Sequence, residues 1–173
     1  MDTFFEQIVA IRKTGKTMLA IVGIWVLFII VAYALFTLGN IFAMFFSICL
    51  LLILLAGWGA FKLTKRFSIE YEYIITNGTF DVDKIIAQSS RKRMMSFEIS
   101  DVQAVEKFNP SAVPNGNFEK TLFACDMDDP AAYYMIVSKE GKGTRLLVFA
   151  PDERIKGAIK KFLPRYMSTS AFN

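Results

Sequence analysis

The feature that most constrains this 173-residue chain is the absence of any charged residue between Lys16 and Lys62. The uncharged stretch divides at Gly39-Asn40 into two apolar segments, 17–38 and 41–61. At 1.5 Å per residue, a helix of either length would span about 30 Å, the thickness of the hydrocarbon core of a bilayer. The sequence therefore predicts a transmembrane helical hairpin over 17–66, with a tight turn at Gly39-Asn40 and a basic flank.

Charged residues beside the hairpin predict its orientation. Six basic side chains flank its open end: Arg12, Lys13, Lys16, Lys62, Lys65 and Arg66. The positive-inside rule then places both ends in the cytoplasm, so we expect a multi-pass protein of the cell membrane whose N-terminus and C-terminal domain are cytoplasmic. A cleaved signal peptide is the less favoured alternative, because the first apolar segment is long and a second follows at once.

The net charge of +4 lies within residues 1–66, because acidic and basic side chains balance in the remainder. Its natural partner is an anionic membrane surface, and no nucleic acid is expected to bind. Within the N-terminal segment 1–16, Phe4, Ile8 and Ile11 recur at helical spacing, which predicts a short amphipathic helix on the inner membrane surface. A frayed terminus is an equally open alternative, since short isolated helices are marginal.

Small residues cluster in "AGWGA" at 56–60 in the second apolar segment. Such residues allow two helices to approach closely. They predict either a contact between copies of the chain or packing within the hairpin, and packing within the hairpin is the favoured interpretation.

From Phe67 onward the apolar period changes from helical to two, which is typical of a half-buried strand. Asn77-Gly78 supplies the two positive-φ positions of a type I′ turn. A two-residue turn would pair Thr76 with Thr79 and Ile75 with Phe80, so that the apolar faces of both strands match. Further strands are predicted at 79–88, 93–99, 102–108, 118–125, 131–139 and 143–150. An amphipathic helix follows, opened by acidic Asp152 and Glu153 and stopped at Pro164.

These elements resemble a known architecture. The hairpin "YIITNG" (73–78), the basic "RKR" (91–93), "SFEISDVQAV" (96–105) and the final helix are similar to those of bacterial pleckstrin-homology-like domains that follow a two-helix membrane hairpin. The resemblance is closer still to an uncharacterised family of small bacterial membrane proteins. It implies an α+β membrane protein in which residues 67–173 form a pleckstrin-homology-like β-barrel of about seven strands, capped by the C-terminal helix. The shared motifs are structural and bring no catalytic residue.

Two clusters of charge are candidate sites. Arg91, Lys92 and Arg93 form a predicted basic turn that could contact anionic lipid, although a solvated turn is the favoured interpretation. Glu72, Asp81 and Asp83 could share an outward strand face and hold a divalent cation, but calcium requires six or more oxygen ligands and a solvated face is favoured. No metal site is therefore predicted.

The chain contains no histidine and only two cysteines, Cys49 and Cys125. It therefore lacks the commonest general base and the usual zinc ligand, and neither an enzyme nor a cofactor is expected. The sequence predicts a non-enzymatic interaction module that presents its domain at the cytoplasmic membrane face and binds a protein, a peptide or anionic lipid. Self-association also stays open. The alternative is a small regulatory subunit of an oligomeric membrane transport complex.

Overall fold

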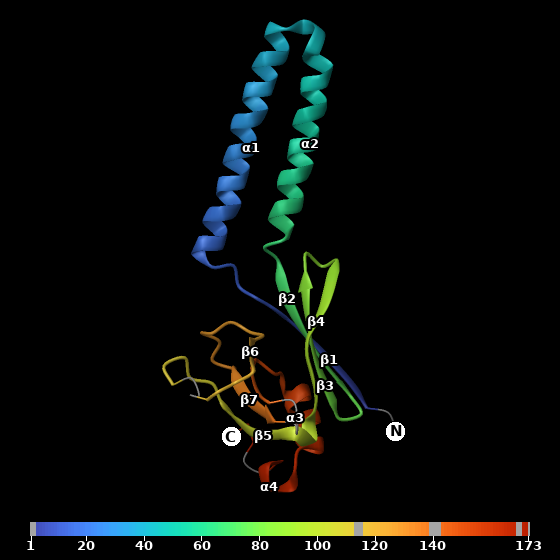
Figure 1. Cartoon of the computed structure of the whole chain (residues 1–173), viewed down its shortest axis with the longest axis vertical. Coiled ribbons are helices and arrows are strands. Elements are labelled where there is room, and N and C mark those ends of the chain that lie inside the picture. Colours follow the sequence, from blue (N-terminus) through green and yellow to red (C-terminus); the bar gives the residue numbers. More distant parts are fainter. Residues whose placement is uncertain (1–2, 113–115, 139–142, 169–170, 173) are drawn as a thin grey trace. The chain divides into compact units, whose positions relative to one another are not determined.

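The computed structural model describes residues 3–112, 116–138, 143–168 and 171–172. The chain divides into two compact units, one formed by residues 12–68 and the other by residues 1–11 together with 69–173. The second unit is thus assembled from two separate pieces of the sequence. Figure 1 labels most of the helices and strands of both units.

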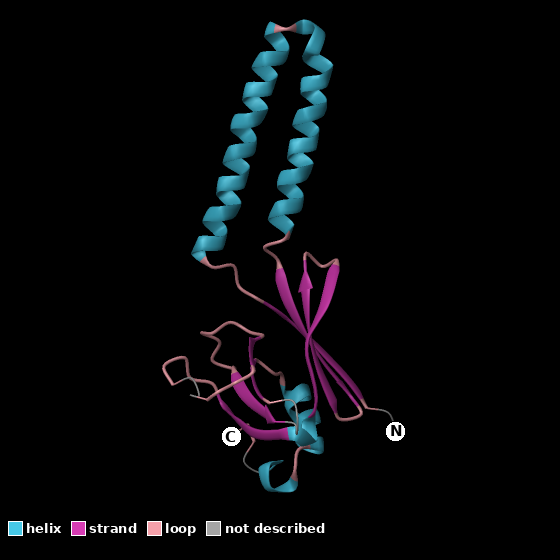
Figure 2. Ribbon diagram, viewed as in Figure 1, coloured by secondary structure: helices cyan, strands magenta, loops and turns pink. Residues whose placement is uncertain are grey.

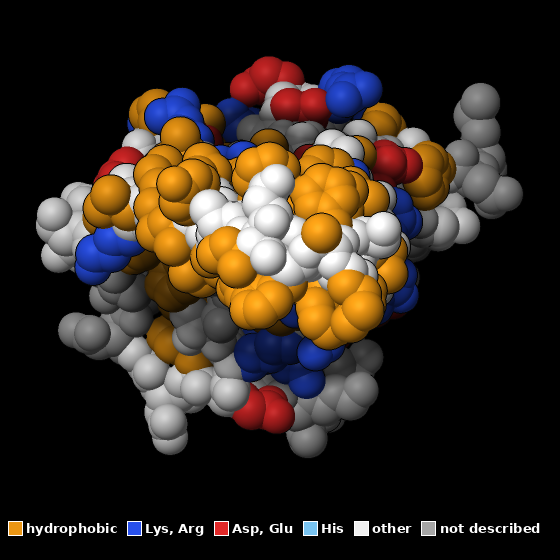
Figure 3. Space-filling model, turned by 90° about the horizontal axis from the view of Figure 1, so that it is seen from above, with side chains coloured by type: hydrophobic (Ala, Val, Ile, Leu, Met, Phe, Trp, Pro, Cys, Tyr) orange, Lys and Arg blue, Asp and Glu red, His pale blue; other side chains and the backbone are white. Residues whose placement is uncertain are grey.

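The first unit is a helical hairpin of α1 (Gly15–Ile41), a short 3-10 helix η1 (Ala43–Phe45) and α2 (Phe46–Lys65). Both predicted apolar segments are helices long and apolar enough to cross a membrane. The predicted turn at Gly39-Asn40 is wrong, because α1 continues through both residues. Gly39 instead allows close packing: a Cβ placed there would lie 3.2 Å from the Cβ of Cys49. Figure 3 looks onto the turn end of the hairpin, where hydrophobic side chains gather.

Small residues of α2 pack inside this hairpin. A Cβ on Gly57 would lie 3.3 Å from the ring of Phe28 in α1, and Ala60 is buried. This confirms the favoured interpretation of the small-residue cluster for these two positions.

The second unit begins with sheet A, an antiparallel sheet in the order β1-β2-β3-β4. Its strands are β1 (Phe4–Ala10), β2 (Ile69–Thr76), β3 (Thr79–Ile86) and β4 (Ser90–Glu98). Asn77 and Gly78 have φ values of 49° and 93°, as a type I′ turn requires. Thr76 pairs with Thr79 and Ile75 with Phe80, which confirms the predicted register.

The N-terminal amphipathic helix predicted within 1–16 is wrong, because residues 4–10 form strand β1 beside β2. Phe5 and Val9 turn toward the core, whereas Phe4 and Ile8 stay exposed. Because apolar residues lie on both faces of this strand, their spacing in the sequence fits a strand as well as a helix. Pairing with β2 decides between them, because it supplies backbone partners that a short isolated helix lacks.

Sheet B has the order β5-β7-β8-β6, and Figure 2 shows the strands and helices of the chain in separate colours. Its strands are β5 (Val102–Lys107), β6 (Lys120–Phe123), β7 (Tyr133–Ser138) and β8 (Thr144–Phe149), and β6 runs parallel to β8. The 3-10 helix η2 (Ile99–Asp101) leads from β4 into β5, and α3 (Glu153–Phe162) and α4 (Arg165–Ser168) follow β8.

The α+β class is confirmed, but the predicted closed barrel of about seven strands is wrong. The described residues form eight strands in two separate four-stranded sheets. The eighth strand is β1, and the chain passes through η2 from the edge of one sheet to the edge of the other without pairing β4 to β5.

The core lies between the two sheets and α3. Tyr73 is fully buried, and its hydroxyl donates to the carbonyl of Ala124 at 2.7 Å and accepts from the N–H of Ala150 at 3.2 Å. Its ring contacts those of Phe80 and Phe149, with centroids 6.2 and 5.7 Å away. One polar atom of β2 therefore links the residues that follow two neighbouring strands of sheet B, β6 and β8.

The C-terminal helix covers this core as predicted. Ile155 and Ile159 of α3 are buried, and the carboxylate of Asp152 caps the helix by accepting from the N–H of Ile155 at 2.8 Å. The side chain of Gln7 in β1 donates to the carbonyl of Ala150 at 3.0 Å and accepts from the N–H of Asp152 at 2.8 Å. Strand β1 thus holds the junction between β8 and α3.

Candidate functional site: a groove beside the free edge of β5

The residues predicted to form a basic turn, Arg91, Lys92 and Arg93, lie within strand β4, so this structural prediction is wrong. The turn comes earlier, at residues 87–89, where Ala87 and Gln88 adopt positive φ angles. The run of charges looked like a solvated turn because the carboxylate partners of its arginines lie on other strands, on β2 for Arg91 and on β3 for Arg93, which a local pattern does not reveal.

Arg91 and Arg93 pair with the predicted acidic row. Arg91 Nη2 lies 2.9 Å from Glu72 Oε1, and Arg93 Nε lies 3.1 Å from Asp83 Oδ1. Arg93 Nη1 also lies 3.1 Å from Asp81 Oδ2. The guanidinium groups of Arg91 and Arg93 thus lie beside the carboxylates at which the sequence had suggested a bound metal cation.

The acidic residues do not form a uniformly solvated face. Glu72 is 1% exposed and Asp83 is 4% exposed, which corrects the favoured interpretation for these two residues. Burial raises the pKa of Glu72, as do a hydrogen bond that its protonated form donates to Glu6 and the nearby charge of Asp83, against the opposing effect of Arg91. Within the described residues, no group of three or more acidic, cysteine or histidine side chains is arranged to hold a metal ion.

The basic residues that the sequence predicts to lie beside the membrane are at the two ends of the hairpin unit. Lys16 is in the first turn of α1, and Lys62 and Lys65 are in the last turns of α2. Arg12 and Lys13 precede α1, and Arg66 follows α2. The ammonium groups of Lys62 and Lys65 lie over the rings of Trp58 and Phe61, at 4.9 and 4.6 Å from the centroids.

A different candidate site lies at the edge of sheet B. Strand β5 is the first strand of that sheet and pairs only with β7 in the described part of the chain. A bulge at Gln103 shifts the pairing, so that Val102 lies opposite Val137 but Ala104 lies opposite Ile136. The bulge lets Val102 and Val105 both turn inward although they are three positions apart.

Ladder geometry identifies the backbone groups on the free edge. The N–H of Phe108 donates to the carbonyl of Ala132 at 2.9 Å, which makes these two residues a hydrogen-bonded pair. Hydrogen-bonded pairs alternate along an antiparallel ladder, so Ala104 and Glu106 also bond toward β7. The N–H and C=O groups of Val105 and Lys107 therefore point away from β7, toward the open edge.

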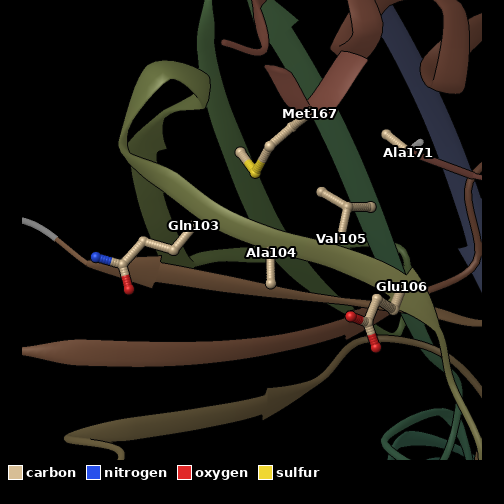
Figure 4. A pocket seen from close by; sticks show the side chains of 6 residues that line it. All are labelled: Gln103, Ala104, Val105, Glu106, Met167 and Ala171. Atoms are coloured by element: carbon tan, nitrogen blue, oxygen red, sulfur yellow. The ribbon is translucent and has the colours of Figure 1, made fainter. Parts of the chain in front are cut away.

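A groove of about 220 Å³ runs beside this edge, and its lining residues are Gln103, Ala104, Val105, Glu106, Met167 and Ala171. Figure 4 shows Val105 directed toward the side of β5 where Met167 and Ala171 lie, while Ala104 and Glu106 point to the other side. Met167 and Ala171 are buried, whereas Glu106 is exposed. The groove thus joins an apolar side and a polar side across one strand.

A tyrosine holds the carboxylate of Glu106 in place. The hydroxyl of Tyr134, the cross-strand neighbour of Glu106, donates to Glu106 Oε2 at 2.5 Å. Burial, together with the hydrogen bond to Glu106 and the negative charge of its carboxylate, raises the pKa of Tyr134 to about 12. The hydroxyl therefore stays protonated at neutral pH and continues to donate.

Sequence reasoning found strand β5 but missed the groove. The three-residue spacing of Val102 and Val105 was the one local signal, since it breaks the period of two and indicates a bulge. Nothing local indicates that β5 is an edge strand, or that Met167 and Ala171 lie beside it.

Comparison with protein families gives one match, which covers nearly the whole chain. A family model described as a bacterial PH-like domain (DUF6106) matches residues 1–169, from β1 through the hairpin to α4. Comparisons with curated proteins and with solved structures found no match.

Proposed function

We propose that this chain, which belongs to the DUF6106 family of bacterial PH-like domains, is a membrane-anchored, non-enzymatic interaction module. It binds an extended peptide segment along β5. The observation that carries the proposal is the free edge of β5 beside the groove lined by Val105, Met167 and Ala171. The partner is a β-strand-like segment of another protein.

Backbone groups on the edge favour a peptide. An added strand would use the outward N–H and C=O groups of Val105 and Lys107, and each hydrogen bond would contribute a net of about 0.5–1.5 kcal/mol. The groove, at about 220 Å³, is smaller than the roughly 300–1,000 Å³ typical of small-molecule sites. It therefore suits one or two side chains of a peptide better than a cofactor.

The hairpin supports the membrane part of the proposal. Strands β1 and β2 pair directly, so the two ends of the hairpin continue into neighbouring strands of one sheet. This connection favours both ends on the same side of a membrane. The six basic residues at those ends favour the cytoplasmic side. Tethering to a membrane would raise the local concentration of partners there, so that a weak peptide contact could suffice.

The alternatives predicted from the sequence receive less support. Binding of anionic lipid through Arg91, Lys92 and Arg93 would require two arginines to leave the carboxylates of Glu72, Asp81 and Asp83. A regulatory subunit of a transport complex would need a partner for the hairpin. An apolar groove of about 250 Å³ between α1 and α2 could receive part of such a partner, but nothing in the groove indicates which partner that would be.

The test uses the full-length protein in phosphatidylcholine nanodiscs. Peptides would be selected from a displayed random library, and the affinity of the enriched peptides would be measured against two variants. Lys107→Pro removes the outward N–H without touching the ladder to β7, and proline is tolerated at such an edge position. Lys107→Ala is the matched control, because it removes the same side chain and keeps the N–H.

We expect Lys107→Pro to abolish binding and Lys107→Ala to retain it. Hydrogen exchange with bound peptide should slow selectively at the amides of Val105 and Lys107. An unsuccessful selection, or equal affinity for the two variants, would count against the proposal.

A further inference from the structure

The two sides of β5 differ chemically at the groove. Val105, Met167 and Ala171 are all buried apolar side chains on one side. On the other side, Glu106 is exposed and Ala104 is too small to cover it. A strand bound at this edge would meet both sides, because its own side chains alternate between them.

Alternation fixes which ligand residue meets which side. In a paired strand, the residue directly opposite Val105 directs its side chain to the same side as Val105. The two residues next to it in the ligand point to the other side, where one lies opposite Ala104 and the other lies opposite Glu106. This holds whether the ligand runs parallel or antiparallel to β5.

The carboxylate of Glu106 is positioned to accept hydrogen bonds from a cationic side chain. Its Oε2 accepts the hydroxyl of Tyr134, and an ionised carboxylate can only accept hydrogen bonds. The cross-strand neighbours of Ala104 and Glu106 are Ile136 and Tyr134, which pack against a small apolar cluster on this side of sheet B. The aliphatic part of a long basic side chain could lie over Ala104 and Ile136 while its charge reaches Glu106.

We infer that the peptide ligand of β5 carries an apolar residue directly next to an arginine or lysine, with the apolar side chain on Val105, Met167 and Ala171 and the basic side chain on Glu106. This inference rests on the proposed function, and it names the ligand class of the same groove. Strand β5 would thus recognise the positive charge of the peptide on one side and its apolar side chain on the other.

The probes are three acetylated and amidated heptapeptides, Thr-Thr-X-Val-X-Thr-Thr, in which X is arginine, glutamine or glutamate. Placing X on both sides of valine puts one copy opposite Glu106 in either strand direction. Affinities for the full-length protein would be measured by isothermal titration calorimetry in zwitterionic phosphatidylcholine nanodiscs, so that the lipid does not attract the cationic peptide.

We expect the arginine peptide to bind about two- to fivefold more tightly than the glutamine peptide, and the glutamate peptide to bind more weakly by a similar factor, as for exposed ion pairs. Glu106→Gln should remove this order, and Glu106→Arg should reverse it. Replacing the central valine of the arginine peptide with asparagine should weaken binding.

The outcomes separate the two proposals. Equal binding of all three peptides, all lost in Lys107→Pro, would overturn the inferred ligand class and leave strand addition at β5 supported. A preference for arginine that persists in Glu106→Gln would also overturn the ligand class. Binding that is the same in Lys107→Pro and Lys107→Ala would overturn the proposed function itself.

Discussion

The N–H of Ile11 donates a 3.0 Å hydrogen bond to the carbonyl of Ile69. This bond continues the ladder of β1 and β2, whose last pair before it is Ala10 with Glu70. Residues 12–68, which contain the whole hairpin, therefore occupy the position of the turn between two antiparallel strands. The β unit is thus built from residues 1–11 as well as from the chain after the hairpin.

Replacing residues 12–68 with Asn-Gly should give a soluble, folded β unit. Ile11 and Ile69 form a hydrogen-bonded pair, which is the flank that a two-residue type I′ turn requires. We expect cooperative urea unfolding and the β-sheet signal of a folded protein in circular dichroism.

A chain of residues 69–173 alone is the informative contrast. It lacks Phe5 and Val9, which pack on the core, and each half-buried side chain contributes about 1 kcal/mol. It also lacks the two hydrogen bonds of Gln7, worth about 0.5–1.5 kcal/mol each. Together these losses are a large part of the stability of an ordinary domain, so this chain should unfold at much lower urea or aggregate. Equal stability of the two chains would show that β1 is dispensable.

Tyr73→Phe should destabilise the β unit by about 1–3 kcal/mol, because it leaves the carbonyl of Ala124 and the N–H of Ala150 without their buried partner. The measurement is the free energy of urea unfolding in the soluble Asn-Gly-linked chain. Tyr166→Phe is the control, since Tyr166 is 75% exposed and should change little. Similar effects of the two substitutions would argue against the bridging role of the Tyr73 hydroxyl.

Glu72→Gln should remove a pH dependence of stability. Burial and the neighbouring Glu6 raise the pKa of Glu72 above the model-peptide value of 4.5. A raised carboxyl pKa stabilises the folded state below the unfolded pKa, and that contribution is lost as pH rises through the folded pKa. The stability of Glu72→Gln relative to the natural chain should therefore increase as pH rises above about 4.5, which urea midpoints at a series of pH values would measure.

Glu6→Gln tests the cause of that shift. It removes the negative charge by which Glu6 raises the pKa of Glu72, so the pH dependence should become smaller. Parallel pH profiles for the natural chain and Glu72→Gln would show that Glu72 does not titrate as argued.

Arg93→Ala and Lys92→Ala should separate structural from lipid roles of the basic run. Arg93 pairs with the buried Asp83 and with Asp81, whereas Lys92 is exposed and lies opposite Lys84. Arg93→Ala should lower the urea midpoint, and Lys92→Ala should leave it unchanged. If the run contacts anionic lipid, Lys92→Ala should also reduce sedimentation with anionic vesicles. Unchanged sedimentation would count against the lipid contact.

Elements defined by neighbouring residues were predictable. Asn77-Gly78 sets the turn and register of β2 and β3 through its own backbone preference, and the structure has that register. Asp152 likewise caps α3 within one turn. In both cases the physical cause lies within a few residues of its effect.

Elements that depend on distant partners were not predictable. Strand β1 looked helical because its partner β2 begins only after the hairpin, and Arg91 looked solvated because Glu72 lies on a different strand. The groove beside β5 also depends on residues far apart in the sequence, since Met167 lines it together with residues of β5. No periodicity within one segment could reveal these contacts.

The proposed orientation predicts opposite labelling at two engineered cysteines. Met44 is 82% exposed in η1 at the turn of the hairpin, and Ser90 is exposed at the start of β4. In a Cys49→Ala background, Met44→Cys should react with a membrane-impermeant maleimide in cells whose outer surface is accessible. Ser90→Cys should react only after lysis, because the basic residues at the open end of the hairpin favour the inner side of the membrane. Labelling of Ser90→Cys before lysis would invert the orientation, and labelling of both before lysis would contradict a spanning hairpin.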